Sequence, residues 1–269
     1  MCLSPIMIPI DKVTGRKWQQ VPCGKCLECM RHATTEWALR IMLEALDYEQ
    51  NSCITLTYND AHLPEKSLLK PKDTQDWLKR LRKALSPVKV RFFLSGEYGS
   101  KRGRPHYHVI LFGYDPPDKV YSFTKNGHKY YRSKFIQDTW SLYDEPIGNI
   151  IVTDLTYQGA FYSAKYLQKS LFEDMEVRPF IRMSNRPGIG FNSVYMSDVQ
   201  TDKIYFEGRA YQIPRYFLKV LEREGVVLDD LKSSRRLSAA NAYKFTTVQD
   251  LYLRQNRAEN LLRDYLKKS

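Results

Sequence analysis

The chain has 269 residues, of which 43% are hydrophobic and 13% aromatic, so it can bury a sizeable core and is not a disordered protein. Its 42 lysines and arginines against 30 acidic residues give a formal charge of +12, which favours an anionic partner such as nucleic acid. The sequence contains neither a long apolar run nor a basic start followed by an apolar segment, so we expect no membrane span and no secretory leader.

The predicted elements begin with a helix over residues 34–50. Apolar side chains recur in it at helical spacing from Trp37 to Tyr48, with a threonine cap before it. A strand, an amphipathic helix, two strands joined by a glycine- and lysine-rich loop, a further strand and a helix follow, at residues 52–60, 72–85, 89–99, 105–113, 149–155 and 157–171. We expect irregular structure at 114–150, a basic, glycine-rich loop at 182–192, and helices at 211–225 and from about 230 onward.

This order of elements predicts an α+β fold, in which helices cover at least one face of an antiparallel sheet. We divide the chain into a cysteine-rich segment at 1–32, a central domain at 33–215 and a helical carboxy-terminal extension at 216–269. No internal repeat or low-complexity tract interrupts this pattern.

Two histidines stand two positions apart in the predicted strand PHYHVILFG. Side chains alternate along a strand, so His106 and His108 face the same side, roughly 7 Å apart. Antiparallel partners in the hairpin have residue numbers that sum to about 203, which places Glu97 opposite the pair. Two imidazoles and a carboxylate make an open site for magnesium or manganese, although zinc or cobalt would also fit. The alternative is two polar residues on the solvent face of an amphipathic strand.

Two tyrosines stand four positions apart in the predicted helix FYSAKYLQK. Tyr162 and Tyr166 would project from one helix face roughly 6 Å apart, with Lys165 beside them. A tyrosine can attack a phosphodiester and hold the strand as an aryl phosphate, which conserves the bond energy for rejoining. The positive charge of Lys165 would favour the phenolate or neutralise charge on the phosphate. The alternative is that the pair packs against the sheet and that Lys165 is solvated.

Together these blocks resemble a known family. VPCGKCLEC, CITLTY, SGEYGSKRGRPHYHVILFG and FYSAKYLQK span residues 2 to about 170 and are similar to motifs of the HUH endonucleases, the rolling-circle replication initiators. Among these the sequence looks most like the short gokushovirus type of the microviruses. The resemblance implies the HUH fold, a central antiparallel sheet of about five strands flanked by helices. It also makes Tyr107 the bulky residue between the two histidines.

The reaction implied by the resemblance is site-specific nicking of one origin strand. His106, His108 and Glu97 would hold Mg²⁺ or Mn²⁺, and Tyr162 and Tyr166 would be the nucleophiles. The enzyme would form a 5′-phosphotyrosine link, leave a 3′-hydroxyl primer and later rejoin the strands to finish rolling-circle replication. The alternatives are a strand transferase of the transposase or relaxase type, and a non-enzymatic zinc-knuckle protein that binds DNA.

The implied substrate is single-stranded or melted origin DNA in the cytoplasm of a bacterial host. We expect Lys101, Arg102 and Arg104 on the hairpin loop to contact phosphates, with solvated loop charges as the alternative. The sequence has no GxxxxGK[ST] phosphate loop, so the implied partners are a host helicase and polymerase. We expect a monomer.

Three of the five cysteines form a C-x2-C-x2-C cluster, at Cys23, Cys26 and Cys29. A tetrahedral zinc site needs a fourth ligand, for which we favour Cys2 over His32. An iron–sulfur cluster and plain reduced thiols are the alternatives. The odd number of cysteines argues against a disulfide framework and fits a cytoplasmic protein. We expect Cys53 in the core.

Overall fold

The computed structural model describes residues 2–9, 18–99, 103–169, 176–244 and 247–268. The chain divides into two compact units. One comprises residues 37–192, and the other comprises residues 1–36 together with 193–269. The domain boundaries expected after residues 32 and 215 stay a prediction.

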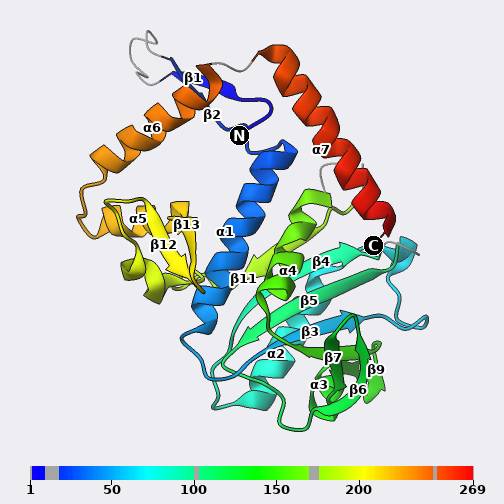
Figure 1. Ribbon diagram of the computed structural model, residues 1–269. Coiled ribbons are helices and arrows are strands. Elements are labelled where there is room, and N and C mark those ends of the chain that lie inside the picture. The colour runs from blue at the N-terminus through cyan, green and yellow to red at the C-terminus, as the bar shows by residue number, and fades with distance from the viewer. Residues whose placement is uncertain (1, 10–17, 100–102, 170–175, 245–246, 269) are drawn as a thin grey trace. The chain divides into compact units, whose positions relative to one another are not determined.

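The unit of residues 37–192 is built on a seven-stranded antiparallel sheet (Figure 1). Its spatial order is β11, β4, β5, β3, β10, β7, β6. The strands are β3 (Asn51–Thr57), β4 (Arg91–Tyr98), β5 (Pro105–Phe112), β6 (Val120–Lys125), β7 (His128–Arg132), β10 (Ile150–Asp154) and β11 (Phe180–Met183). A short hairpin joins β8 (Ser141–Leu142) to β9 (Glu145–Pro146). The α+β class is confirmed, but the expected number of about five strands was too low.

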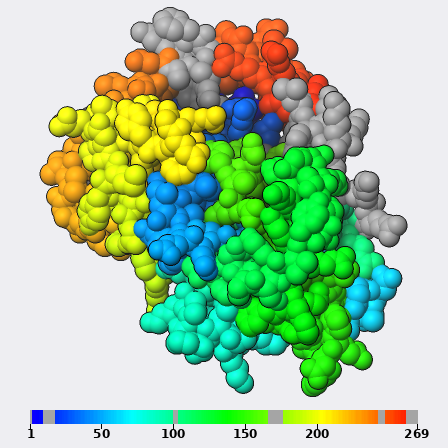
Figure 2. Space-filling view, turned by 60° about the horizontal axis from the view of Figure 1, so that its bottom comes forward, coloured from blue at the N-terminus to red at the C-terminus, as the bar shows by residue number. Residues whose placement is uncertain are grey.

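The strands beyond the expected five are the hairpin of β6 and β7, in the region that we expected to be irregular. Its turn is Asn126–Gly127, with φ angles of 51° and 77°, as a two-residue hairpin turn requires. Most hairpin residues are exposed, so the strands lack the alternation that marks a half-buried strand. Figure 2 shows the green part of the chain, which includes this hairpin, widely exposed at the surface.

Helices cover both faces of the sheet. On one side, which we call the α2 face, Trp77 and Leu81 pack against Tyr107 and Val109 of β5. On the other side, the α4 face, Ile110 and its neighbours on the strands pack against two helices. The helices and short 3₁₀ turn of this unit are α1 (Leu27–Ala45, from Trp37 onward), η1 (Glu65–Ser67), α2 (Pro71–Leu85), α3 (Lys134–Thr139) and α4 (Tyr157–Lys169).

Helix α2 follows directly from its sequence pattern. Its buried side chains recur three or four residues apart, at Trp77, Leu78, Leu81 and Leu85, and Pro71 occupies the first turn, where its missing N–H costs nothing. Full burial of each large side chain contributes roughly 1.5–3 kcal/mol to stability. The predicted helix is therefore confirmed.

Helix α1 begins earlier than predicted, and the threonine cap was wrong. Thr34 and Thr35 lie inside the helix, where their hydroxyls donate to the carbonyl oxygens of Met30 and Arg31 at 2.9 and 3.1 Å. A hydroxyl satisfied by the preceding turn no longer needs to cap a helix end. The helix consequently starts within the cysteine-rich segment.

The second unit combines two hairpins with a helical carboxy-terminal part. Its strands are β1 (Ile6–Pro9), β2 (Trp18–Val21), β12 (Lys203–Phe206) and β13 (Arg209–Gln212). Its helices are α5 (Arg215–Arg223), α6 (Asp229–Lys244) and α7 (Val248–Lys268), and a 3₁₀ segment, η2 (Phe191–Met196), begins at the unit boundary. The predicted helical extension is confirmed. Among the described residues, no helix combines the length and apolar character needed to cross a bilayer.

Candidate metal centre and active site

Glu97, His106 and His108 converge at one end of the β4–β5 pair. Glu97 lies directly opposite His106, as the predicted hairpin register requires, and His108 follows two positions along β5. The ligand atoms of the three side chains all lie within 4.8 Å of one another. The Nε2 atoms of His106 and His108 lie 2.5 and 2.8 Å from the same Glu97 carboxylate oxygen. These side chains therefore form a group that could hold a metal ion.

Hydrogen bonds on the far side of each ring orient both imidazoles. His106 Nδ1 lies 3.2 Å from the Arg104 carbonyl oxygen, which can only accept, so Nδ1 carries a proton and Nε2 is left for a ligand. His108 Nδ1 lies 3.1 Å from the hydroxyl of Thr55 on β3. Contacts of this kind fix the orientation of metal-binding histidines. The sequence analysis missed Thr55, although its position in CITLTY, opposite His108, could have indicated it.

The charge at the site is that of a buried carboxylate. Burial raises the pKa of Glu97, but hydrogen bonds from His106 and His108 outweigh burial and hold that pKa below its ordinary value. Glu97 is therefore ionised at neutral pH. The Glu97 side chain is 2% exposed, whereas those of the two histidines are 19% and 18% exposed. Two nitrogens and a hard oxygen with solvent on one side fit a divalent cation that keeps positions open for phosphate oxygens.

Tyr162 stands beside this group. Its ring lies edge-on to the His108 ring, with the centroids 5.6 Å apart and the planes at 82°. Helix α4 holds Tyr162 there because Ala160 and Ala164 are fully buried and Ser163 is nearly so, which leaves Tyr162, 42% exposed, at the edge of the packed surface. The phenol is accessible to a large substrate.

The other residues of the predicted tyrosine motif are less fully described. Tyr166 has a helical backbone in α4, but its side chain lies outside the described residues. Lys165 is half-buried. The assignment of Tyr166 as a nucleophile stays a prediction.

Of the three predicted phosphate contacts, only Arg104 is described, because Lys101 and Arg102 lie outside the described residues. The Arg104 guanidinium lies 2.5 Å from a carboxylate oxygen of Asp60 and donates to the Tyr58 carbonyl oxygen at 3.1 Å. These bonds hold the loop end against the turn that follows β3. Phosphate binding by Arg104 stays a prediction.

The four cysteines of the amino-terminal segment form a second group. The sulfur atoms of Cys2, Cys23, Cys26 and Cys29 all lie within 4.8 Å of one another, and those of Cys26 and Cys2 are 3.7 Å apart. Backbone N–H groups point at the sulfurs: Cys23 donates to Cys2 at 3.2 Å, Cys26 to Cys23 at 3.2 Å, and Leu3 to Cys26 at 3.3 Å. This group, too, could hold a metal ion.

Of the two candidates for the fourth position, Cys2 belongs to the group and His32 does not. Burial raises the pKa of Cys26, and hydrogen bonds from the backbone of Leu3 and Cys29 outweigh it and lower that pKa to about 7. Cys53 is half-buried and packs beside the hydrophobic cluster of the α4 face.

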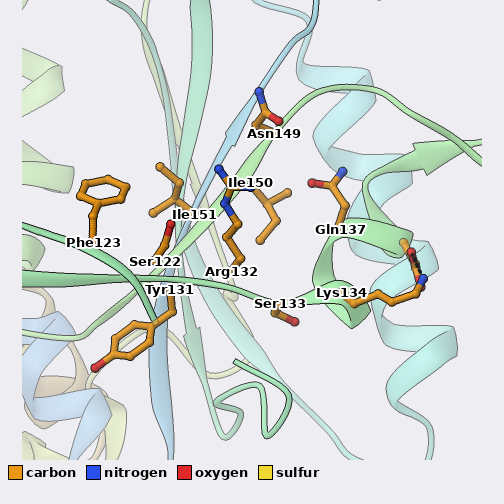
Figure 3. Close-up of a pocket in the computed structure, with 11 residues that line it drawn as sticks. Ser122, Phe123, Tyr131, Arg132, Ser133, Lys134, Gln137, Asn149, Ile150 and Ile151 are labelled. Atoms are coloured by element: carbon orange, nitrogen blue, oxygen red, sulfur yellow. Dashed lines mark hydrogen bonds and ion pairs between the residues drawn. The ribbon is translucent and has the colours of Figure 1, made fainter. Parts of the chain in front are cut away.

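The sequence analysis also missed a pocket where β7 ends and β10 begins. It has a volume of about 530 Å³, and its lining includes Arg132, Gln137 and Asn149 (Figure 3). The turn Asn126–Gly127 could have indicated the hairpin beside it, but not the pocket itself.

The comparisons with known proteins agree on one family. Residues 51–171 match the family of replication-associated proteins of the ORF2 type. Replication-associated protein ORF2 of Spiroplasma virus 4 is 31% identical over 240 residues, which cover 80% of this chain and 72% of that protein. Replication-associated protein ORF4 of Chlamydia phage 1 is 30% identical over 220 residues, 76% of this chain and 54% of that protein.

A third relative, replication-associated protein VP4 of Bdellovibrio phage phiMH2K, is 32% identical over 212 residues, 73% of this chain and 65% of that protein. The matched part of the chain thus spans about half of the Chlamydia phage protein and just under two thirds of the Bdellovibrio phage protein. No solved structure is significantly similar to the chain. The resemblance found in the sequence is confirmed, and the chain belongs to the family of microvirus-type phage replication-associated proteins.

Proposed function

We propose that the protein initiates rolling-circle replication by nicking single-stranded origin DNA, with Tyr162 as a nucleophile. The observation that supports this is the contact between the Tyr162 and His108 rings, 5.6 Å apart, beside the Glu97 carboxylate. An accessible phenol and a group that could bind a divalent cation then share one face of the sheet. The names of the relatives speak of replication alone, so the chemistry is our inference.

In the proposed reaction, the Tyr162 oxygen attacks the phosphorus after losing its proton. The new P–O bond forms as the bond to the 3′-oxygen breaks, and the leaving 3′-oxygen gains a proton. A divalent cation, Mg²⁺ or Mn²⁺, would polarise the scissile phosphate when bound to Glu97, His106 and His108. Lys165 would offset the charge that develops on the phosphate.

The product is a 5′-phosphotyrosine and a 3′-hydroxyl that primes synthesis. Tyr166, one helical turn from Tyr162, would cut the regenerated origin while the first end is rejoined. Lys101, Arg102 and Arg104 would contact backbone phosphates. A host helicase and polymerase would complete the process in the cytoplasm of the bacterial host, with the protein acting as a monomer.

The test is a covalent adduct between the protein and a labelled single-stranded origin oligonucleotide in the presence of Mn²⁺. We expect an adduct that survives denaturation, a lower yield for Tyr162→Phe or Tyr166→Phe, and none for the double variant. Tyr143→Phe is the matched control, because Tyr143 is 99% exposed and not part of α4. Full yield from the double variant would disprove the nucleophiles. Binding without any adduct would favour the non-enzymatic DNA-binding protein.

We also propose that Cys2, Cys23, Cys26 and Cys29 hold a structural zinc ion. Four converging sulfurs, three of them accepting backbone N–H bonds, match the donor set and closed geometry of structural zinc sites. The ion would fix the amino terminus to the start of α1, since Cys29 lies in the first turn of that helix.

Metal analysis of the purified protein tests this proposal. We expect one zinc per chain, lost in Cys2→Ser and kept in Cys53→Ser, which removes a thiol outside the group. A brown protein that contains iron would replace zinc by an iron–sulfur cluster. A protein free of both metals when purified without chelator would leave the thiols as reduced cysteines and refute the site.

A further inference from the structure

The hairpin of β6 and β7 has the composition of a surface that binds single strands. Residues 120–132 contain Lys125, Lys129 and Arg132 but no acidic residue. They also contain four aromatic side chains, at Tyr121, Phe123, Tyr130 and Tyr131. Cationic and aromatic groups together recognise single-stranded nucleic acid, because phosphates pair with the charges and bases stack on the rings.

Two of these rings already form a stack. Phe123 and Tyr130 lie face to face, with centroids 4.6 Å apart and planes 9° from parallel. Phe123 is nevertheless 40% exposed, which is unusual for a ring of its size unless something covers it. A nucleobase could extend this stack without any rearrangement of the hairpin.

The pocket beside the hairpin offers polar groups to a base edge. Figure 3 shows Arg132 reaching from β7 toward Ile151 and Asn149, with Gln137 of α3 on the other side. Arg132 and Asn149 are both exposed. A volume of about 530 Å³ lies within the range of small-ligand pockets.

The pocket lies on the same face and at the same end of the sheet as the metal centre. Thr57 of β3 is the direct cross-strand partner of His106, and its N–H and hydroxyl both donate to the Asn149 carbonyl oxygen, at 3.0 and 2.9 Å. Two strand spacings, about 10 Å, therefore separate His106 from Asn149. A single strand held at the metal centre can reach the pocket within a few nucleotides.

We propose that this pocket and the hairpin bind nucleotides of the origin strand next to the cleaved phosphate. Bases stack on Phe123 and Tyr130, while Arg132 and Asn149 bind a phosphate or a base edge. The inference rests on the proposed function, since it specifies where the same DNA strand continues beyond the metal centre. It adds a binding site on β6 and β7, strands that lie at the far edge of the sheet from β4.

Fluorescence anisotropy of the full chain with labelled oligothymidine, in the presence of chelator, measures this binding without cleavage. We expect Phe123→Ala and Arg132→Ala each to weaken affinity about tenfold, and Phe123→Trp to restore it because the stacking surface returns. The matched control is the double variant Lys83→Ala, Tyr143→Ala, which removes one cation and one exposed ring outside the hairpin. Thermal unfolding checks that each variant is folded.

Photo-crosslinking to an oligonucleotide that contains bromodeoxyuridine gives an independent measurement. We expect the crosslinked peptide to contain Phe123 or Tyr130. Wild-type affinity in the folded hairpin variants, with crosslinks elsewhere, would overturn the inference even if the tyrosine adduct forms. Weaker binding in those variants without any adduct from the wild type would instead refute nicking and leave the binding site standing. Stronger binding of oligouridine than of oligothymidine would overturn DNA as the ligand.

Discussion

Replacement of Thr55 by valine tests whether the histidine pair is built to hold a metal. The Thr55 hydroxyl lies 3.1 Å from His108 Nδ1, on a strand in the middle of the sheet. A cation on His108 Nε2 requires Nδ1 to keep its proton and donate it to Thr55. Valine has the same shape and a high strand propensity, but it cannot accept that hydrogen bond.

The expected loss is set by this one contact. Removal of a residue that orients a metal-binding histidine lowers metal affinity about 10- to 100-fold. A single neutral hydrogen bond contributes roughly 0.5–1.5 kcal/mol, so we expect the lower end, about tenfold. Isothermal titration with Mn²⁺ measures the change.

Thr57→Val is the matched control, because Thr57 lies on the same strand and face but its hydroxyl bonds Asn149 rather than a histidine. We expect it to lower stability slightly and to leave Mn²⁺ affinity unchanged. Equal Mn²⁺ affinity in the wild type and Thr55→Val, with both proteins folded, would refute the reasoning.

Three further predictions concern the scaffold of the site, each measured by denaturant unfolding. Tyr107→Phe should lower stability by about 1–3 kcal/mol, because the buried hydroxyl bonds Tyr58 and both backbone groups of Lys70; an unchanged midpoint would contradict this. Gly148→Ala should cost more than about 3 kcal/mol, since its Cβ would lie 1.9 Å from the Thr57 carbonyl oxygen, whereas Gly159→Ala, with its nearest contact at 3.4 Å, should be tolerated. Glu44→Gln should cost about 3–5 kcal/mol, because buried Glu44 pairs with Arg91 at 2.5 Å and accepts the Gly190 N–H at 2.6 Å; retention of wild-type stability would show that the pair is dispensable.

The centre of the fold could be predicted because local pattern and long-range pairing agree there. Strict alternation fixes which side of β5 carries His106, and a short connection fixes its register with β4, so Glu97 could be placed before any coordinates. Helix α2 has the same clarity, since its apolar residues form one continuous stripe. In both cases a single face is buried.

The rest depended on contacts that local pattern does not encode. The β6–β7 hairpin is exposed on both sides, so only its Asn126–Gly127 turn marks it. Thr34 and Thr35 have the chemistry of capping residues, but tertiary packing carries α1 past them. The choice of Cys2 rather than His32 beside the other thiols is a matter of loop closure, which spacing alone could not decide.

The side chains of β5 link chemistry to folding through a spacing of two. Because Tyr107 is fully buried on the α2 face while its neighbours face solvent, one inserted residue ahead of it would turn the strand over, sending an imidazole into the apolar interior and the phenol into water. Insertions or deletions of a single residue within this strand should thus be lethal to the phage, whereas changes in pairs would only slide the donors along it.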